Sequence, residues 1–157
     1  TGTEEKRKPN IINSLFLDPV ELEKHNFKLD KKYKEIEENE LRYEMYKMDD
    51  AEIVMVAYGT TSRIVKNAID ALRKDNIKAG LIRPITLWPY PFKAFKEISN
   101  SAKAILTVEM SMGQMLDDVK IANEGRLPVH FYGRTGGMIP TPDAIIEKAK
   151  EILGGER

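Results

Sequence analysis

Apolar and polar positions from Ile53 onward follow one repeating order: an aliphatic run, a turn, then an amphipathic helical stretch. This order is typical of a parallel β-sheet covered by helices. It predicts strands at 53–58, 78–82, 104–108 and 129–132, and helices near 61–74, 91–99, 113–123 and 142–153. We therefore expect an α/β fold built on four parallel strands.

The last of these helices has the clearest boundary signals. Thr141 is a favoured N-cap residue, Pro142 suits the first helical position, and Asp143 favours the positive end of a helix. Gly154 and Gly155 are expected to end it. Helical spacing predicts a buried stripe of Ile145, Ala149 and Ile152.

Residues 1–50 differ from the rest of the chain because they hold 23 of its 50 Asp, Glu, Lys and Arg residues. We place the domain boundary near Asp49 and Asp50, which gives a charged, mainly helical linker at 1–50 and an α/β domain at 51–157. Asp18 and Pro19 predict the start of a short helix. We interpret the charge run as a solvated face rather than an interaction tail.

A second, longer helix is expected from Leu29 to about Tyr46. Its imperfect apolar stripe consists of Leu29, Tyr33, Ile36, Tyr43 and Tyr46. The segment from Tyr43 to Met48 is also compatible with an edge strand, so both interpretations stay open. Whether this region folds alone depends on a surface that buries the stripe.

Composition narrows the possible functions. Lys plus Arg equals Asp plus Glu at 25 each, so net charge does not attract nucleic acid or an anionic membrane. The absence of cysteine excludes a cysteine nucleophile, a disulfide and cysteine-ligated iron–sulfur or zinc sites on this chain. No apolar run approaches about 20 residues and no signal-peptide core is visible, so we expect a cytoplasmic protein. The opening TGTEEKRKP, without an initiator Met, predicts a piece of a longer polypeptide.

Two turns at the predicted carboxyl ends of strands are candidate anion sites. The first consists of Gly59, Thr60, Thr61 and Ser62, where small residues lead into a helix N-terminus with outward N–H groups. It lacks the Lys–Ser/Thr pair of a P-loop and the G-x-G-x-x-G of a dinucleotide site. The alternative is that this turn only connects a strand to a helix.

The second candidate consists of Arg134, Thr135, Gly136 and Gly137. Glycines admit a ligand close to the backbone, and an arginine binds phosphate or carboxylate through two donors. A tight crossover that requires positive φ explains the same glycines without any ligand.

The sequence contains no recognisable catalytic or metal-binding set. His25 and His130 lie far apart without partners at metal-ligand spacing, and no G-x-S-x-G elbow occurs. Glu109 at a strand end is either a general base or an acceptor for the turn amides of residues 112–114. Met110, Met112 and Met115 are interpreted as core or a subunit contact. The segment RPITLWPYP holds three prolines, which predicts a rigid, extended connector.

Four segments, in order, resemble the C-terminal domain of the α subunit of 2-oxoacid:ferredoxin oxidoreductases. They are DDAEIVMVAYGTTSRIVKNAIDALR, GLIRPITLWPYP, ILTVEMSMGQM and YGRTGGMIPTPDAI. Within that family the sequence is most similar to the branched-chain type, 2-oxoisovalerate:ferredoxin oxidoreductase. The resemblance covers essentially the whole chain, since TGTEE also resembles the segment that leads into the charged linker.

The resemblance implies a fold like the transketolase C-terminal domain. That fold has three α/β/α layers and a mixed sheet of about five strands, one of them an antiparallel edge strand. The fifth strand would then come from the residues before Asp50. The fold positions that carry over are Gly59, Pro84, Glu109, Gly113, Gln114, Gly136 and Gly137. Ser111 departs from the family, where asparagine is frequent, and this affects only the cap of the following helix.

The family's reaction is the thiamine-diphosphate-dependent oxidative decarboxylation of a 2-oxoacid, with the acyl group passing to coenzyme A and electrons to ferredoxin. The resemblance places thiamine diphosphate and magnesium in the preceding domain and the β subunit, and iron–sulfur clusters in a ferredoxin-like subunit. It implies β, γ and ferredoxin-like subunits as partners, with no cofactor, metal or catalytic residue on this chain. We expect a structural domain, inactive when isolated. The alternative is a domain that binds coenzyme A or another anion at the strand carboxyl ends.

Overall fold

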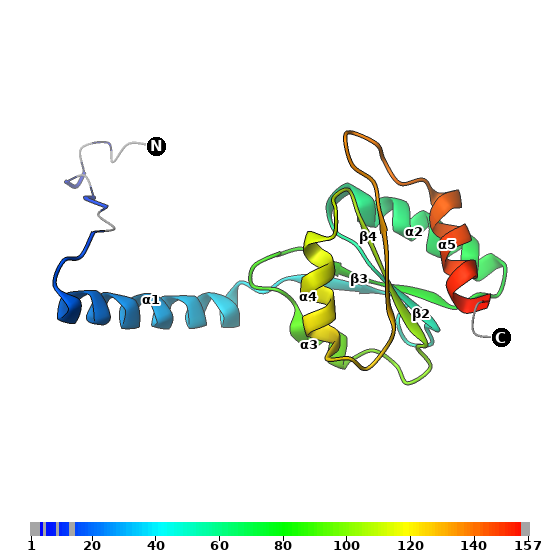
Figure 1. Cartoon of the computed structure of the whole chain (residues 1–157), viewed down its shortest axis with the longest axis horizontal. Helices are drawn as coiled ribbons and strands as arrows, with labels where there is room; N and C mark the ends of the chain where they lie inside the picture. Colours follow the sequence, from blue (N-terminus) through cyan, green and yellow to red (C-terminus); the bar gives the residue numbers. More distant parts are fainter. Residues whose placement is uncertain (1–3, 5, 9, 13–14, 155–157) are drawn as a thin grey trace. The chain divides into compact units, whose positions relative to one another are not determined.

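The computed structural model describes residues 4, 6–8, 10–12 and 15–154 of the chain (Figure 1). It divides into two compact units, Thr1–Asn39 and Glu40–Arg157. The division falls before the boundary that charge suggests near Asp49, because a strand at Tyr43–Tyr46 belongs to the sheet of the second unit.

The first unit contains one helix, α1, at Pro19–Asn39. We predicted a short helix and a separate one from Leu29, but the helix is continuous. Asp18 caps it as predicted, since its Oδ1 accepts hydrogen bonds from the N–H of Val20 at 2.8 Å and of Glu21 at 3.0 Å. No residue of α1 is buried, although Leu22, Leu29 and Ile36 repeat on one side. Because isolated helices of this kind are marginal in water, the stripe needs a covering surface.

The second unit is built on a five-stranded sheet. Its strands are β1 at Tyr43–Tyr46, β2 at Ile53–Val56, β3 at Ala79–Pro84, β4 at Ala104–Glu109 and β5 at Val129–Gly133. Their order is β1-β3-β2-β4-β5. β2, β3, β4 and β5 pair in parallel, and β1 pairs antiparallel with β3 at the edge. The mixed five-stranded sheet implied by the family resemblance is confirmed.

β1 resolves the two interpretations of residues 43–48. A helix reaching Tyr46 is wrong, and the edge strand is confirmed. Tyr43 and Met45 pack against the core on one face of the sheet, while Tyr46 packs against the core on the other. Successive side chains of a strand point to opposite faces of the sheet. These residues can therefore pack against both cores only as a strand.

Helices cover both faces of the sheet, as expected for three layers. α2 at Gly59–Lys74 and α5 at Pro142–Gly154 lie on one face, and α3 at Phe92–Lys96 and α4 at Gln114–Asn123 lie on the other (Figure 1). The stripe predicted for α5 is confirmed, because Ile145, Ala149 and Ile152 are its buried residues. α3 is shorter than the predicted 91–99, since the backbone beyond Lys96 forms tight turns at Glu97 and Ile98.

Gly80 provides a stability prediction for the β1 side of the sheet. A Cβ at this position would lie 2.7 Å from Met48 Sδ and 2.8 Å from the backbone O of Lys47. We expect Gly80→Ala to lower the free energy of unfolding by about 2 kcal/mol, because overpacking forces the backbone to shift. Urea unfolding followed by circular dichroism measures the change.

Gly154→Ala is the matched control, because a Cβ there meets nothing within 4 Å. It should leave stability unchanged or raise it slightly. Equal stability of Gly80→Ala and the unmodified chain would contradict the packing described around Met48.

Candidate functional site

The carboxyl edge of the parallel strands is the place where open α/β sheets bind ligands. β2 is followed by a helix on one face and β4 by a helix on the other (Figure 1). The strand order therefore reverses direction between β2 and its neighbour β4. The carboxyl ends of β2, β4 and β5 all lie at this edge. Gly59 to Ser62 form the first turn of α2, Glu109 is the last residue of β4, and residues 134–137 follow β5.

The turn after β2 has little polar surface to offer a ligand. Gly59 has a φ of +55°, and Tyr58 occupies the N-cap position without a side-chain cap. The Ser62 hydroxyl donates to the backbone O of Gly59 at 2.7 Å, and both Thr61 and Ser62 are buried. Thr60 is the exposed hydroxyl of this turn. The geometry accounts for Gly59 as a connection that needs positive φ.

The turn after β5 presents a more open surface. Gly136 and Gly137 have φ values of +63° and +85°, and a Cβ on either would meet nothing within 4 Å. The backbone N–H of Arg134 donates to the O of Glu109 at 3.1 Å, and that of Met138 donates to Thr135 at 3.1 Å. Within the described residues the Arg134 guanidinium has no hydrogen bond or ion pair. This turn and the Gly59 turn follow strands that are separated by β4.

Glu109 is the most buried polar residue at this edge, with 0% of its surface exposed. Its Oε2 accepts hydrogen bonds from the Ser111 hydroxyl at 2.6 Å and the Met115 N–H at 3.0 Å, and its Oε1 accepts from the Leu116 N–H at 3.0 Å. The carboxylate thus occupies the N-terminus of α4, where an external anion would otherwise bind. The backbone N–H groups that donate to Glu109 are those of Met115 and Leu116. The prediction that residues 112–114 supply them is wrong.

Glu109 accepts from Met115 and Leu116 because of the backbone conformation of Gly113. This residue is the N-cap of α4 and has a φ of +105°. This left-handed turn directs the first free N–H groups of the helix toward the end of β4. With both oxygens of Glu109 occupied and no exposed surface, the geometry supports a structural role for the carboxylate. A general base would have to reach its substrate directly or through one water.

Two further acidic groups lie near Glu109 on the α3 and α4 side. Burial, followed by the charges of Asp118 and Glu109, raises the pKa of the Tyr90 hydroxyl above its usual range. Within the described residues this hydroxyl has no hydrogen-bond partner. Burial also raises the pKa of Asp118, with smaller contributions from Asp117 and Glu109.

Asp118 yields a pH prediction. A carboxyl group whose pKa is higher in the folded state binds more protons there, so its contribution to stability falls as pH rises from about 4 through the folded pKa. Asp118→Asn should therefore raise the free energy of unfolding at pH 7 by up to about 0.5 kcal/mol, with a small rise in melting temperature. This gain should vanish at acidic pH. Thermal unfolding at several pH values tests this, and a gain independent of pH would contradict it.

The histidines and possible metal ligands give no site. His25 stacks on Phe16 in the first unit, with ring centroids 4.5 Å apart. His130 is half-buried in β5. The described residues contain no group of three or more His, Cys, Asp or Glu placed to hold a metal ion. In the same residues no helix has the length and apolar character to cross a membrane.

Exposed apolar side chains gather at the carboxyl edge. Of the nine exposed large apolar residues described in the second unit, eight follow the ends of β3, β4 and β5, and the ninth is Ile121 on α4. We call the eight the carboxyl-edge surface: Ile85, Leu87, Trp88, Phe92, Met110, Met112, Met138 and Ile139. The sequence indicates the proline-rich connector and the methionines after β4, but no periodic pattern indicates Met138 and Ile139.

The sequence matches known proteins over most of its length. Residues 51–145 match the family model of pyruvate:ferredoxin oxidoreductase core domain II. The chain is 47% identical over 153 residues to ketoisovalerate oxidoreductase subunit VorB of Methanothermobacter marburgensis, covering 98% of this chain and 43% of that protein. It is 46% identical to the VorB of Methanothermobacter thermautotrophicus, covering 92% of this chain and 41% of that protein. The chain spans less than half the length of these curated relatives.

Solved structures agree on the fold. A 2-oxoglutarate:ferredoxin oxidoreductase from Magnetococcus marinus, with 2-oxoglutarate, coenzyme A and succinyl-CoA bound, matches with a TM-score of 0.72 at 21% identity, covering 87% of this chain and 24% of that chain. A split-gene transketolase matches with a TM-score of 0.58 at 18% identity, covering 74% and 42%. The family match and the VorB relatives, together with this fold, show that the chain belongs to the pyruvate:ferredoxin oxidoreductase core domain II family, domain II of 2-oxoacid:ferredoxin oxidoreductase α subunits.

Proposed function

We propose that this chain is a non-catalytic assembly domain of the α subunit of a ketoisovalerate (2-oxoisovalerate):ferredoxin oxidoreductase. The VorB relatives, at 47% and 46% identity, support the choice of 2-oxoacid. In this proposal the complex oxidatively decarboxylates the 2-oxoacid to acyl-CoA and passes electrons to ferredoxin. Thiamine diphosphate, magnesium and iron–sulfur clusters are held elsewhere in the complex, by the rest of the α subunit and by its β, γ and ferredoxin-like partners.

The observation that carries the proposal is the carboxyl-edge surface. Ligand sites in this class of sheet combine a pocket with convergent polar groups, whereas the segments that follow these strands expose Trp88, Phe92 and Met112. Aromatic residues and methionines are enriched in protein interfaces, and clusters of exposed apolar side chains mark contact sites. The carboxylate best placed for chemistry, Glu109, is occupied with capping α4. The edge therefore suits contact with a neighbouring subunit better than catalysis.

Co-elution with the β subunit tests the assembly role. We expect this chain and the purified β subunit of the same enzyme to form a complex in size-exclusion chromatography at micromolar concentration. The isolated chain should show no 2-oxoacid oxidation. Separate elution, or turnover by the chain alone, would contradict the proposal.

The second candidate function is binding of coenzyme A or another anion at the turn after β5. The specific observation in its favour is the Arg134 guanidinium, which has no partner in the described residues, beside the open space at Gly136 and Gly137. The candidate residue Thr135 lies next to Arg134 in the same turn, whereas Gly59 to Ser62 follow β2, which β4 separates from β5. Calorimetry with coenzyme A separates the two functions. One-to-one binding that is lost in Arg134→Ala supports this candidate, and absence of heat supports assembly alone.

A further inference from the structure

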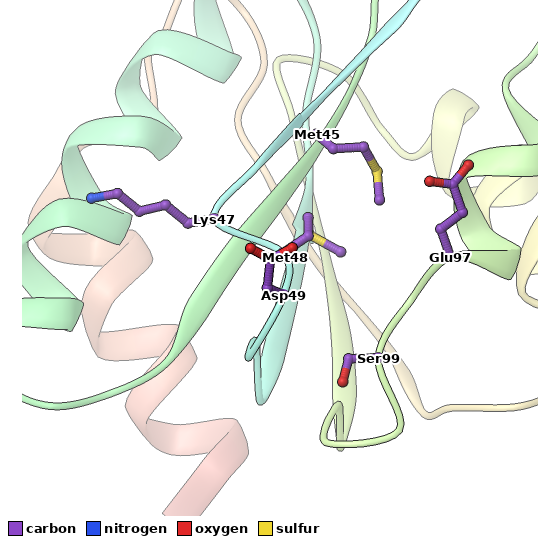
Figure 2. Close-up of a pocket in the computed structure, with 6 residues that line it drawn as sticks. All are labelled: Met45, Lys47, Met48, Asp49, Glu97 and Ser99. Carbon is purple, nitrogen blue, oxygen red and sulfur yellow. The ribbon is translucent and has the colours of Figure 1, made fainter.

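One corner of the sheet in the second unit, beside β1, borders a cavity. On the face covered by α3 and α4, α3 has only five residues, and β1 at the sheet edge stays half-buried along its whole length. A cavity of about 470 Å³ lies beside β1 at this corner (Figure 2). Its lining comes from β1, the β1–β2 turn and the segment after α3: Met45, Lys47, Met48, Asp49, Glu97 and Ser99.

Methionines supply the apolar part of the cavity. Met48 is 6% exposed and Met45 is half-buried, and Figure 2 shows both thioethers on the side that faces Glu97. Thioether side chains are flexible and polarisable, so they adapt to an inserted aliphatic chain. This lining suits the methylene stem of a long side chain.

Carboxylates supply the polar part. Glu97 and Asp49 are both exposed, and neither has an ion pair among the described residues. The Tyr43 hydroxyl donates to Glu97 Oε1 at 3.1 Å, which fixes the position of this carboxylate. Two negative charges at one cavity disfavour an anionic occupant and favour a cationic one.

The lysine that lines the cavity does not neutralise them. Lys47 contributes to the lining, but its Nζ forms an ion pair with Asp70 at 2.6 Å and lies 5.0 Å from the centroid of the Tyr46 ring. Figure 2 shows the Lys47 side chain leading away from Glu97 and Asp49. Among the described residues, the cavity thus keeps two carboxylates without an ion pair, one on each side of the Met48 thioether.

We infer that this cavity is a socket for one lysine or arginine side chain presented by a neighbouring subunit. The aliphatic stem of that side chain lies on Met45 and Met48, and its charged head binds Glu97, while the charge of Asp49 attracts it from the other side of Met48 (Figure 2). The inference rests on the proposed assembly function and extends it to a second contact, distinct in residues and in chemistry from the apolar carboxyl-edge surface. It also assigns a positively charged side chain to the partner.

Affinity for the β subunit, measured by biolayer interferometry, tests the socket. Glu97→Gln should weaken binding about tenfold, because it removes one charge-assisted hydrogen bond, and Asp49→Asn should weaken it less, because Asp49 acts through its charge alone. Glu97→Lys should weaken it further through like-charge repulsion. Glu147→Gln on α5 is the matched control, since Glu147 is exposed and lies outside the cavity lining, and it should bind like the unmodified chain.

A second readout does not depend on the variants. Carbodiimide coupling of glycine ethyl ester to carboxylates should label Glu97 and Asp49 in the free chain and spare them in the complex, while Glu147 stays labelled in both. Complex formation with unchanged affinity of the variants and unchanged labelling would overturn the socket and leave the assembly function standing. Failure of the unmodified chain to bind the β subunit would overturn both.

Discussion

Replacing Glu109 with alanine is expected to destabilise the second unit by about 3–5 kcal/mol, the largest effect of any single change considered for this chain. The variant leaves the Met115 and Leu116 amides and the Ser111 hydroxyl without their acceptor. Each unsatisfied buried donor costs about 1–3 kcal/mol, and a domain has only about 5–15 kcal/mol in total. Urea unfolding at 25 °C measures the loss.

Glu109→Gln separates the charge from the shape of the side chain. The glutamine oxygen can still accept a hydrogen bond, but its NH₂ group faces a donor that the carboxylate accepted from. We therefore expect Glu109→Gln to lower the free energy of unfolding by about 2 kcal/mol. Glu147→Gln, an exposed change on α5, should stay within about 0.5 kcal/mol of the unmodified chain. If Glu109→Gln were equally neutral, the cap on α4 would not be the role of this carboxylate.

Trp88→Ala should weaken binding to the β subunit by about thirtyfold, or roughly 2 kcal/mol. Trp88 is 55% exposed at the centre of the proline-rich connector, where the neighbouring prolines restrict the backbone. An exposed tryptophan on a preorganised segment costs little entropy to bind and buries a large apolar area. Calorimetric titration with the β subunit gives the dissociation constant.

Ile121→Ala is the control for Trp88. Ile121 is 64% exposed, but it lies on α4 outside the carboxyl-edge surface. Its removal should leave affinity unchanged, and urea unfolding should show both variants folded. Equal affinities of Trp88→Ala and the unmodified chain would exclude the connector from the interface.

Local sequence signals were sufficient to predict the cap and buried stripe of α5 and the first turn of α1. In α5 the Thr141 Oγ1 accepts from the Ala144 N–H at 3.3 Å, which confirms the predicted cap, and the buried stripe is the predicted one. Capping and helical periodicity depend on residues within one or two turns, so a single sequence contains them. The parallel strands β2, β3 and β4 are predictable for the same reason, since aliphatic runs mark strands that are buried on both faces.

Features that depend on distant residues were not predictable from spacing alone. β1 forms a strand because β3 pairs with it, and nothing within Tyr43–Tyr46 excludes a helix. Gly113 redirects α4 so that Glu109 reaches Met115 and Leu116, a turn geometry without a unique sequence signature. The carboxyl-edge surface consists of side chains from the segments after three strands, and the Met45–Glu97 cavity lies between β1 and the segment after α3. Only the folded sheet brings these segments together.

Hydrogen exchange of the chain, free and bound to the β subunit, tests the central claim that the carboxyl edge is an assembly surface. We predict slower exchange in the complex at residues 85–88 and 110–115, with unchanged exchange along the exposed face of α5. Complex formation with unchanged exchange in both loop segments would contradict the claim.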